Sequence, residues 1–175
     1  MTEVRIASKK IFTLVLLHIE AQKKILLGFK KRGFGADRYN GFGGKVEAGE
    51  TIEAAAYREL EEEAGITTDV LEKVGLLWFT FRGDTKGLEV HVFRAASYNG
   101  VPMESEEMKP QWFPTSEIPF SQMWADDHHW FPLFLSGKKF VGKFHFLEDQ
   151  VTITGKVLDV VDELPEGFDI GIDSC

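Results

Sequence analysis

The sequence predicts an α+β fold in which a mixed β-sheet lies between α-helices. Strand-like apolar runs both precede and follow two helix-like segments, and a glycine-rich turn leads directly into the first of these helices. Of the 175 residues, 43% are hydrophobic and 13% aromatic, which suffices for one substantial core. We therefore expect one domain over residues 1–164 and a flexible C-terminal tail over 165–175.

The elements follow from apolar periodicity and from turn residues. A polar turn at Ala21-Gln22 separates the first two strands, and glycines at 83 and 87 bound a hairpin turn. The second helix begins near Asp126 or Asp127, either of which could cap it, and ends before Gly137. The predicted strands are 11–19, 25–29, 76–81, 88–95, 109–113, 140–147 and 151–161, and the predicted helices are 52–64 and 126–135.

The first helix has good helix formers and no glycine or proline, and Gly65 supplies its stop. Ile52, Ala56 and Leu60 recur at four-residue spacing, which predicts a buried stripe.

Three carboxylates, Glu59, Glu62 and Glu63, fall together on another face of this helix. Like charges at this spacing repel, so only a cation makes the arrangement favourable. Hard oxygen ligands suit Mg²⁺, with Mn²⁺ as a substitute. A solvated acidic face is the alternative for such a run.

The segment Asn40-Gly41-Phe42-Gly43-Gly44-Lys45 precedes the helix. Its glycines let backbone groups approach a ligand closely. A tight hairpin turn is the alternative, and both can hold at once.

Composition narrows the functional class. A formal net charge of −8 disfavours non-specific nucleic-acid binding. The longest apolar run, Leu14 to Leu17, is far shorter than the roughly 20 residues that span a bilayer, and the N-terminus has no apolar signal segment. The single cysteine, Cys175, excludes an internal disulfide and is a poor nucleophile candidate. We expect a monomer in the cytoplasm, with the nucleus and the mitochondrion as open alternatives, and no membrane or nucleic-acid partner.

The stretch from Gly44 to Ile66 resembles the Nudix box of the Nudix hydrolases. The matching positions are Gly44, Glu50, Arg58-Glu59-Leu60, Glu62-Glu63 and Gly65-Ile66. The resemblance implies the Nudix fold and metal-dependent hydrolysis of nucleoside diphosphates linked to another group. It also implies a metal contact from the Gly43 carbonyl and an orienting role for Arg58 and Glu50. The implied metal ligands are Gly43, Glu59, Glu62, Glu63 and Glu107, with Glu63 or Glu107 as the base.

Stretches outside the box are similar to the oxidised-purine nucleoside triphosphatase branch of this family. They are 30–35, 39–45, 90–93, 104–108, 123–127 and 130–132. This resemblance implies hydrolysis of 8-oxo-dGTP and 2-oxo-dATP type nucleotides to monophosphate and pyrophosphate, which sanitises the nucleotide pool. Another Nudix substrate, such as a methylated purine nucleotide or a dinucleoside polyphosphate, remains open, as does a catalytically idle binding module.

A purine pocket is predicted from residue chemistry. Trp124 offers a stacking face, and Asn40 with Asp126 and Asp127 can read the base edge. The adjacent aspartates could share a proton in an apolar pocket. Core packing is the alternative for Trp124, and helix capping for the aspartates. The expected substrate contacts are Thr13, Lys30, Phe34, Asn40, Phe42, Gly44, Lys45, Phe79, Leu88, Trp124, Asp126 and Asp127, and Phe81 could also line the pocket.

Three features depart from the usual residues of this branch. Leu88 stands where methionine is common, and Trp78 replaces a smaller aliphatic residue. Base preference is therefore less constrained than the chemistry. His128-His129 invites a metal interpretation, but neighbouring helical side chains diverge, which favours a surface or rim position.

Overall fold

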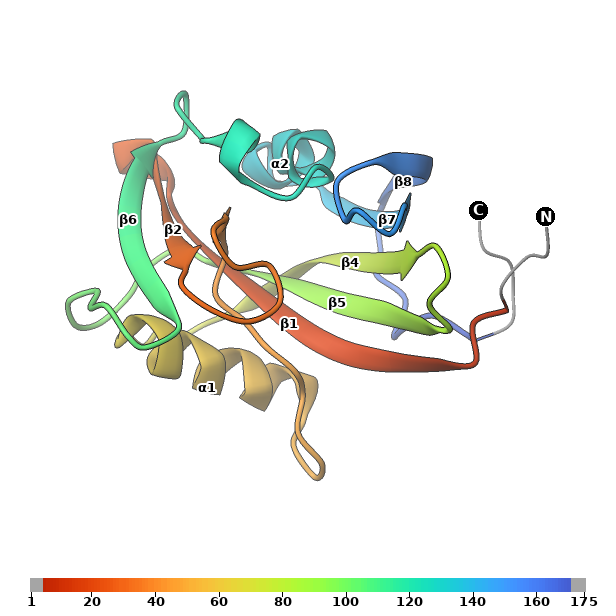
Figure 1. Ribbon diagram of the computed structural model, residues 1–175. Coiled ribbons are helices and arrows are strands. Elements are labelled where there is room, and N and C mark those ends of the chain that lie inside the picture. Colours follow the sequence, from red (N-terminus) through yellow and green to blue (C-terminus); the bar gives the residue numbers. More distant parts are fainter. Residues whose placement is uncertain (1–4, 171–175) are drawn as a thin grey trace. The chain divides into compact units, whose positions relative to one another are not determined.

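The computed structural model describes residues 5–170, so the expectations for Cys175 and for 171–175 lie outside the described residues. The chain divides into two compact units. Figure 1 labels their helices and strands. The first unit contains the described parts of 1–12, 74–91 and 125–175, and the second contains 13–73 and 92–124. The expectation of one domain over 1–164 stays a prediction.

In the second unit, strand β2 (Lys24–Lys30) is central. It pairs antiparallel with β1 (Ser8–Ile19), with β3 (Tyr39–Asn40) and with β6 (Met108–Pro114). Leu26 lies opposite Leu17 of β1 and Trp112 of β6. The turn between β1 and β2 is a short 3-10 helix, Glu20–Gln22. The two-residue strand β3 was not predicted, because so short a polar segment has no apolar period.

Helix α1 (Ile52–Ala64) has the predicted bounds. The Thr51 side chain accepts a hydrogen bond from the Ala54 amide at 3.1 Å, which satisfies a free donor of the first turn. At the other end Gly65 adopts a left-handed backbone with φ 69°, and its amide donates to the Glu61 carbonyl. The turn residues of the sequence therefore determine both ends of the helix.

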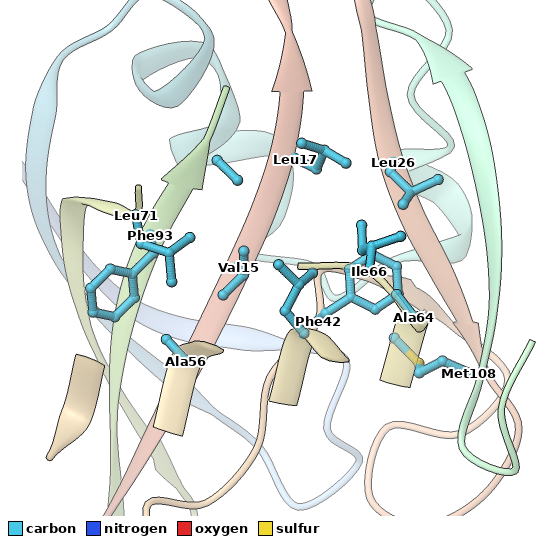
Figure 2. Close-up of a cluster of buried hydrophobic side chains, with 12 residues drawn as sticks. Val15, Leu17, Leu26, Phe42, Ala56, Ala64, Ile66, Leu71, Phe93 and Met108 are labelled. Carbon is cyan, nitrogen blue, oxygen red and sulfur yellow. The ribbon is translucent and has the colours of Figure 1, made fainter. Parts of the chain in front are cut away.

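One face of α1 packs into the core of the second unit. Figure 2 shows Ala56 and Ala64 directed toward Val15 of β1 and toward Phe42, which belongs to residues 40–45, the glycine segment. Ala56 and Leu60 are fully buried, and Ile52 packs at the margin, which confirms the predicted stripe. The cluster comprises Val15, Leu17, Leu26, Phe42, Ala56, Leu60, Ala64, Ile66, Leu71, Phe93, Ala95 and Met108.

In the first unit, β4 (Glu72–Phe81) pairs parallel with β7 (Lys139–Phe146), and β7 pairs antiparallel with β8 (Ile153–Val161). Strand β5 (Lys86–Ala95) follows β4 and is its neighbour, as expected for the predicted hairpin. Helix α2 (Asp127–Leu135) contacts β7. The core of the first unit is aromatic, and its fully buried rings are those of Trp130, Phe131, Phe134, Phe140, Phe144 and Phe146.

Parallel and antiparallel pairs occur together with helices, so the α+β class with a mixed sheet is confirmed. In the part of the chain that the structure describes, no helix is both long and apolar enough to cross a membrane.

Part of the predicted C-terminal tail makes hydrogen bonds with strands of the first unit, to which it belongs. The Phe168 amide donates to Glu89 Oε1 at 2.6 Å, and its carbonyl accepts from Lys9 Nζ at 2.5 Å. Glu89 is only 1% exposed and also contacts Lys9 at 3.0 Å and His91 Nε2 at 2.8 Å. The Phe168 ring lies 5.5 Å from Trp78. Residues 165–170 thus include one anchored position, Phe168, while flexibility of the tail stays a prediction.

Glu89→Gln is expected to lower the free energy of unfolding by about 1–3 kcal/mol at pH 7, because a buried charge-assisted network loses its charge. Burial raises the pKa of Glu89, but the Phe168 amide, His91 and Lys9 together hold that pKa below its usual range. The stabilisation is therefore complete above the unfolded pKa of about 4.3 and is lost as the pH falls through the folded value. Denaturant melts of both proteins at pH 7 and at pH 3 measure this difference.

Glu166→Gln is the matched control, because this exposed carboxylate lies in the same segment. It should change the unfolding free energy little at either pH. Equal effects of the two substitutions would contradict the role of Glu89.

Candidate active site

Helix α1 directs a buried carboxylate at the glycine segment. Glu63 is 4% exposed, and its Oε1 accepts a hydrogen bond from the Gly43 amide at 2.8 Å. The segment is fastened to β1 by the Thr13 amide, which donates to the Gly44 carbonyl at 2.9 Å, and by two bonds between Val15 and Phe42. The loop is therefore held between a strand and the helix.

Two glycines of this segment lie close to other groups, and Gly43 is the one that backbone atoms leave no room to replace. A Cβ at position 43 would overlap the Thr13 carbonyl, and a Cβ at position 44 would overlap the Glu59 carboxylate. Neither glycine has a positive φ, so close approach rather than backbone conformation accounts for both.

Arg58 ties the helix to the segment that precedes it. Its Nε and Nη2 donate to the two oxygens of Glu50 at 2.7 and 2.8 Å, and its Nη1 donates to Glu59 Oε1 at 3.0 Å. This bidentate pair lowers the pKa of Glu50 to about 2. Arg58 Nη1 also contacts Glu62 Oε2 at 3.2 Å, and the Glu62 side chain is 59% exposed. The Glu62 carboxylate is therefore an exposed group that is paired with Arg58, whereas the Glu63 carboxylate is buried.

A second segment, 103–107, reaches the C-terminal end of α1. Ser105 Oγ donates to the Glu63 carbonyl and the Met103 amide donates to the Ala64 carbonyl, each at 2.9 Å. The Glu107 carboxylate contacts Arg32 Nε at 2.8 Å and Lys30 Nζ at 3.4 Å.

The pKa values of the carboxylates diverge. Burial raises the pKa of Glu63 to about 7; the Gly43 amide and Lys30 oppose this shift, while the charges of Glu59 and Glu107 add to it. Burial also raises the pKa of Glu59. The hydrogen bond from Arg32 lowers the pKa of Glu107. Glu63 is thus the carboxylate of this set that changes protonation near neutral pH.

The donor chemistry fits a hard divalent cation. Glu59, Glu63 and Glu107 are close enough to shift the pKa of Glu63, and a positive charge among them would relieve that repulsion. Within residues 5–170, no group of three or more His, Cys, Asp or Glu side chains is already arranged to hold a metal. Glu59 and Glu62 are both paired with Arg58, and Glu107 is paired with Arg32.

Trp124 lies beside the loop that follows β2. Its ring centroid is 5.1 Å from that of Phe34, and the Arg38 guanidinium lies 4.1 Å from the ring centroid. A Cβ on Gly35 would come within 3.0 Å of the indole nitrogen. Arg38 was not predicted, because its contact with Trp124 joins residues far apart in the sequence.

The remaining predicted residues of the second unit differ in accessibility. Asn40 is half-buried, and its Oδ1 accepts from the Gly41 amide at 2.9 Å. Thr13 Oγ1 is buried and has no hydrogen-bond partner within the described chain. Lys45 is exposed. The Phe42 ring is fully buried in the core cluster, and the predicted substrate contact of Phe42 stays a prediction.

In the first unit, Asp126 and Asp127 are 2% and 3% exposed. Asp126 occupies the N-cap position of α2, but its side chain makes no capping hydrogen bond. The possibility that it caps the helix through its carboxylate is therefore wrong. Its Oδ2 instead accepts from Trp130 Nε1 at 2.9 Å. Burial raises the pKa of Asp126 to about 6, against hydrogen bonds that include one from Trp130 and one with Asp127.

Phe79, Phe81 and Leu88 are half-buried in the same unit. Phe79 stacks on Phe144 with centroids 5.9 Å apart, and Phe81 stacks on Phe146 at 5.5 Å. The rings of His128 and His129 lie 3.9 Å apart; His128 is exposed and His129 half-buried.

Gly44→Ala is expected to lower the free energy of unfolding by about 1–3 kcal/mol, because the new methyl group meets the Glu59 carboxylate. Denaturant unfolding measures the cost. The matched control is the same substitution in a Glu59→Ala background, where the added cost should be small. A full and equal cost in both backgrounds would show that Glu59 is not the obstacle.

Comparison with known proteins places the chain in a family. The NUDIX domain matches residues 11–134. An oxidized purine nucleoside triphosphate hydrolase of Danio rerio is 55% identical over 157 residues, which cover 90% of this chain and 99% of that protein. The protein of the same name from Mus musculus is 52% identical over 156 residues, covering 89% and 98%. The crystal structure of a mutator MutT protein from Bacillus halodurans superposes with a TM-score of 0.76 at 28% identity, covering 86% of this chain and 97% of that one. The resemblance and the fold expected from the sequence are thereby confirmed, and the chain belongs to the NUDIX family.

Proposed function

We propose that this protein hydrolyses oxidised purine nucleoside triphosphates, of the 8-oxo-dGTP and 2-oxo-dATP type, to the monophosphate and pyrophosphate. The observation that carries the proposal is the buried carboxylate of Glu63, held by the Gly43 amide in a loop whose glycines leave no room for side chains. The names of the relatives from Danio rerio and Mus musculus support the choice of substrate.

Glu59, Glu63 and Glu107 would hold a divalent cation, which supplies charge neutralisation at the phosphates and lowers the pKa of a bound water. Mg²⁺ is the expected ion, with Mn²⁺ as a substitute, because all these donors are hard oxygens. A contribution of Glu62 and of the Gly43 carbonyl belongs to the same proposal.

The chain's own residues position the substrate. Lys30 lies at the edge of the carboxylate set and offers a cation to a phosphate oxygen. We assign the same role, contact with a phosphate oxygen, to Lys45 and to the backbone of Gly44 in the glycine segment. Arg58 has two hydrogen bonds to Glu50, and these hold the preceding loop in a fixed position against α1.

Glu63 is the better candidate for the base. Burial raises the pKa of Glu63 to about 7 in the metal-free protein. A bound cation would lower this pKa, so that the carboxylate is ionised and can take a proton from the attacking water near neutral pH. The contact with Arg32 makes Glu107 a weaker base, since it lowers the pKa of that carboxylate. Attack at phosphorus then depends on positioning and on charge neutralisation.

For the base we propose stacking on Trp124 and edge contacts from Asn40, Asp126 and Asp127. The buried Thr13 hydroxyl, which has no partner in the described chain, offers a further hydrogen bond to a ligand. Phe34, Phe79, Phe81 and Leu88 contribute apolar surface. We further propose that the protein acts as a monomer in the cytoplasm.

Pyrophosphate release from oxidised, methylated and unmodified purine triphosphates, each with and without Mg²⁺, tests this function. The proposal expects release from the oxidised nucleotides at the highest kcat/KM and only with the metal. A preference for methylated or unmodified nucleotides would overturn the substrate assignment, and no release from any of them would overturn the activity.

Glu63→Gln is expected to reduce turnover by about 10² or more, since one transition-state contact is lost. It should also stabilise the metal-free protein. Because the folded pKa of Glu63 is raised, from about 4.3 in the unfolded chain to about 7, folding stability falls as the pH rises through this window. At pH 8 the variant should therefore gain on the order of 1–3 kcal/mol.

Thermal melts at pH 5 and pH 8 without metal, set beside turnover, measure both effects. Glu62→Gln is the control for stability, because the Glu62 side chain is 59% exposed and should show no such gain. Near-normal turnover of the Glu63 variant would remove this residue from the catalytic set.

A further inference from the structure

Helix α2 contains a hydrogen bond that the proposed reaction has not yet used. Trp130 lies four residues after Asp126, so the two side chains fall on the same face. The indole Nε1 donates to Asp126 Oδ2 at 2.9 Å, and both residues are buried, with 0% and 2% exposure.

The indole has little freedom to leave this contact. The Trp130 ring stacks on Phe140 with centroids 5.4 Å apart and an interplanar angle of 25°. On α2 itself it contacts the Phe131 ring at 4.6 Å. A close-packed aromatic ring of this kind holds its polar edge in one direction.

The chemistry of the donor then determines the state of the acceptor. An indole nitrogen can donate a hydrogen bond but cannot accept one. Asp126 Oδ2 is therefore an acceptor at this contact in either protonation state. A proton on Oδ2 would make that oxygen a poorer acceptor for the indole, so the contact favours a protonated carboxyl with its proton on Oδ1. Oδ1 is then the oxygen that can present either a donor or an acceptor to a neighbour, and the carboxyl also has hydrogen bonds with Asp127 and with the Asp126 backbone.

We propose that Trp130 is a positioning residue for purine selection, which engages Asp126 Oδ2 so that Oδ1 is the oxygen of this carboxyl that reads the base edge. This inference rests on the proposed function, in which Asp126 contacts the base. Trp130 itself touches no substrate in this scheme and acts through Asp126.

Asp126→Asn is the first test, because Trp130 should also orient the new amide. The amide oxygen accepts from the indole, so the amide nitrogen takes the place of Oδ1 and presents only a donor. The ratio of kcat/KM for an oxidised guanine to an oxidised adenine nucleotide should then change by about tenfold or more. In the double variant with Trp130→Phe the amide is free to turn over, and the ratio should return toward that of the unmodified protein.

Trp130→Phe alone should shift the same ratio while retaining pyrophosphate release. Phe134→Leu is the matched control, because it removes buried aromatic volume from the same helix and no hydrogen-bond donor. It should lower the melting temperature and leave the ratio unchanged. A ¹H–¹⁵N spectrum adds a readout without turnover: the indole signal that Trp130→Phe removes should move in Asp126→Asn.

An unchanged substrate ratio in Trp130→Phe, or an indole signal that does not respond to Asp126→Asn, would overturn this inference and leave the proposed function intact. An unchanged ratio in Asp126→Asn would overturn both this inference and the proposed contact of Asp126 with the base, while the proposed hydrolysis would stand. Should Trp130→Phe fail to fold, the ratio in Asp126→Asn still decides, together with the number of indole signals that move in its spectrum: no moving indole signal would overturn the inference. Lack of pyrophosphate release by the unmodified protein would instead overturn the proposed function, and the inference with it.

Discussion

The candidate site depends on one constraint, the burial of the Glu63 carboxylate against the Gly43 amide. A buried carboxylate is costly unless hydrogen bonds satisfy it, and here the backbone of the glycine segment supplies the donor. That donor is available only because the segment approaches α1 without side chains. The bonds from β1 to Gly44 and Phe42 then hold the backbone in place. Sheet, loop and helix are therefore coupled through one ionisable group.

The cations around this group divide the acidic residues by role. Arg58 binds Glu50 with two hydrogen bonds, so this pair is structural and stays ionised. Arg32 keeps Glu107 ionised at the margin of the site. Neither cation pairs directly with Glu63, whose pKa is therefore set mainly by burial. The distribution of positive charge thus leaves one carboxylate poised near neutral pH.

Local signals predicted α1 well, because Thr51, Gly65 and the apolar stripe act within the helix itself. They could also have indicated the contacts of Arg58 with Glu62 and of Trp130 with Asp126, which are both four residues apart. Other features depend on residues distant in sequence. Phe168 binds Glu89, and Arg38 lies over Trp124, contacts that no periodicity encodes. Burial of Phe42 likewise follows from the packing of α1 against β1, which residue type alone does not reveal.

Glu63 and Asp126 are similar in their chemical environment, although one lies on α1 and the other at the start of α2. Each is a buried carboxyl whose pKa is raised toward neutral pH by burial, and each accepts a hydrogen bond from an N–H group. The donor to Glu63 is a backbone amide, so no substitution at position 43 can remove it without moving the loop. The donor to Asp126 is a side chain, which substitution can change without touching the backbone. If both carboxyls act as proposed, hydrolysis is the more rigidly encoded property, and base preference is the property that side-chain changes can alter.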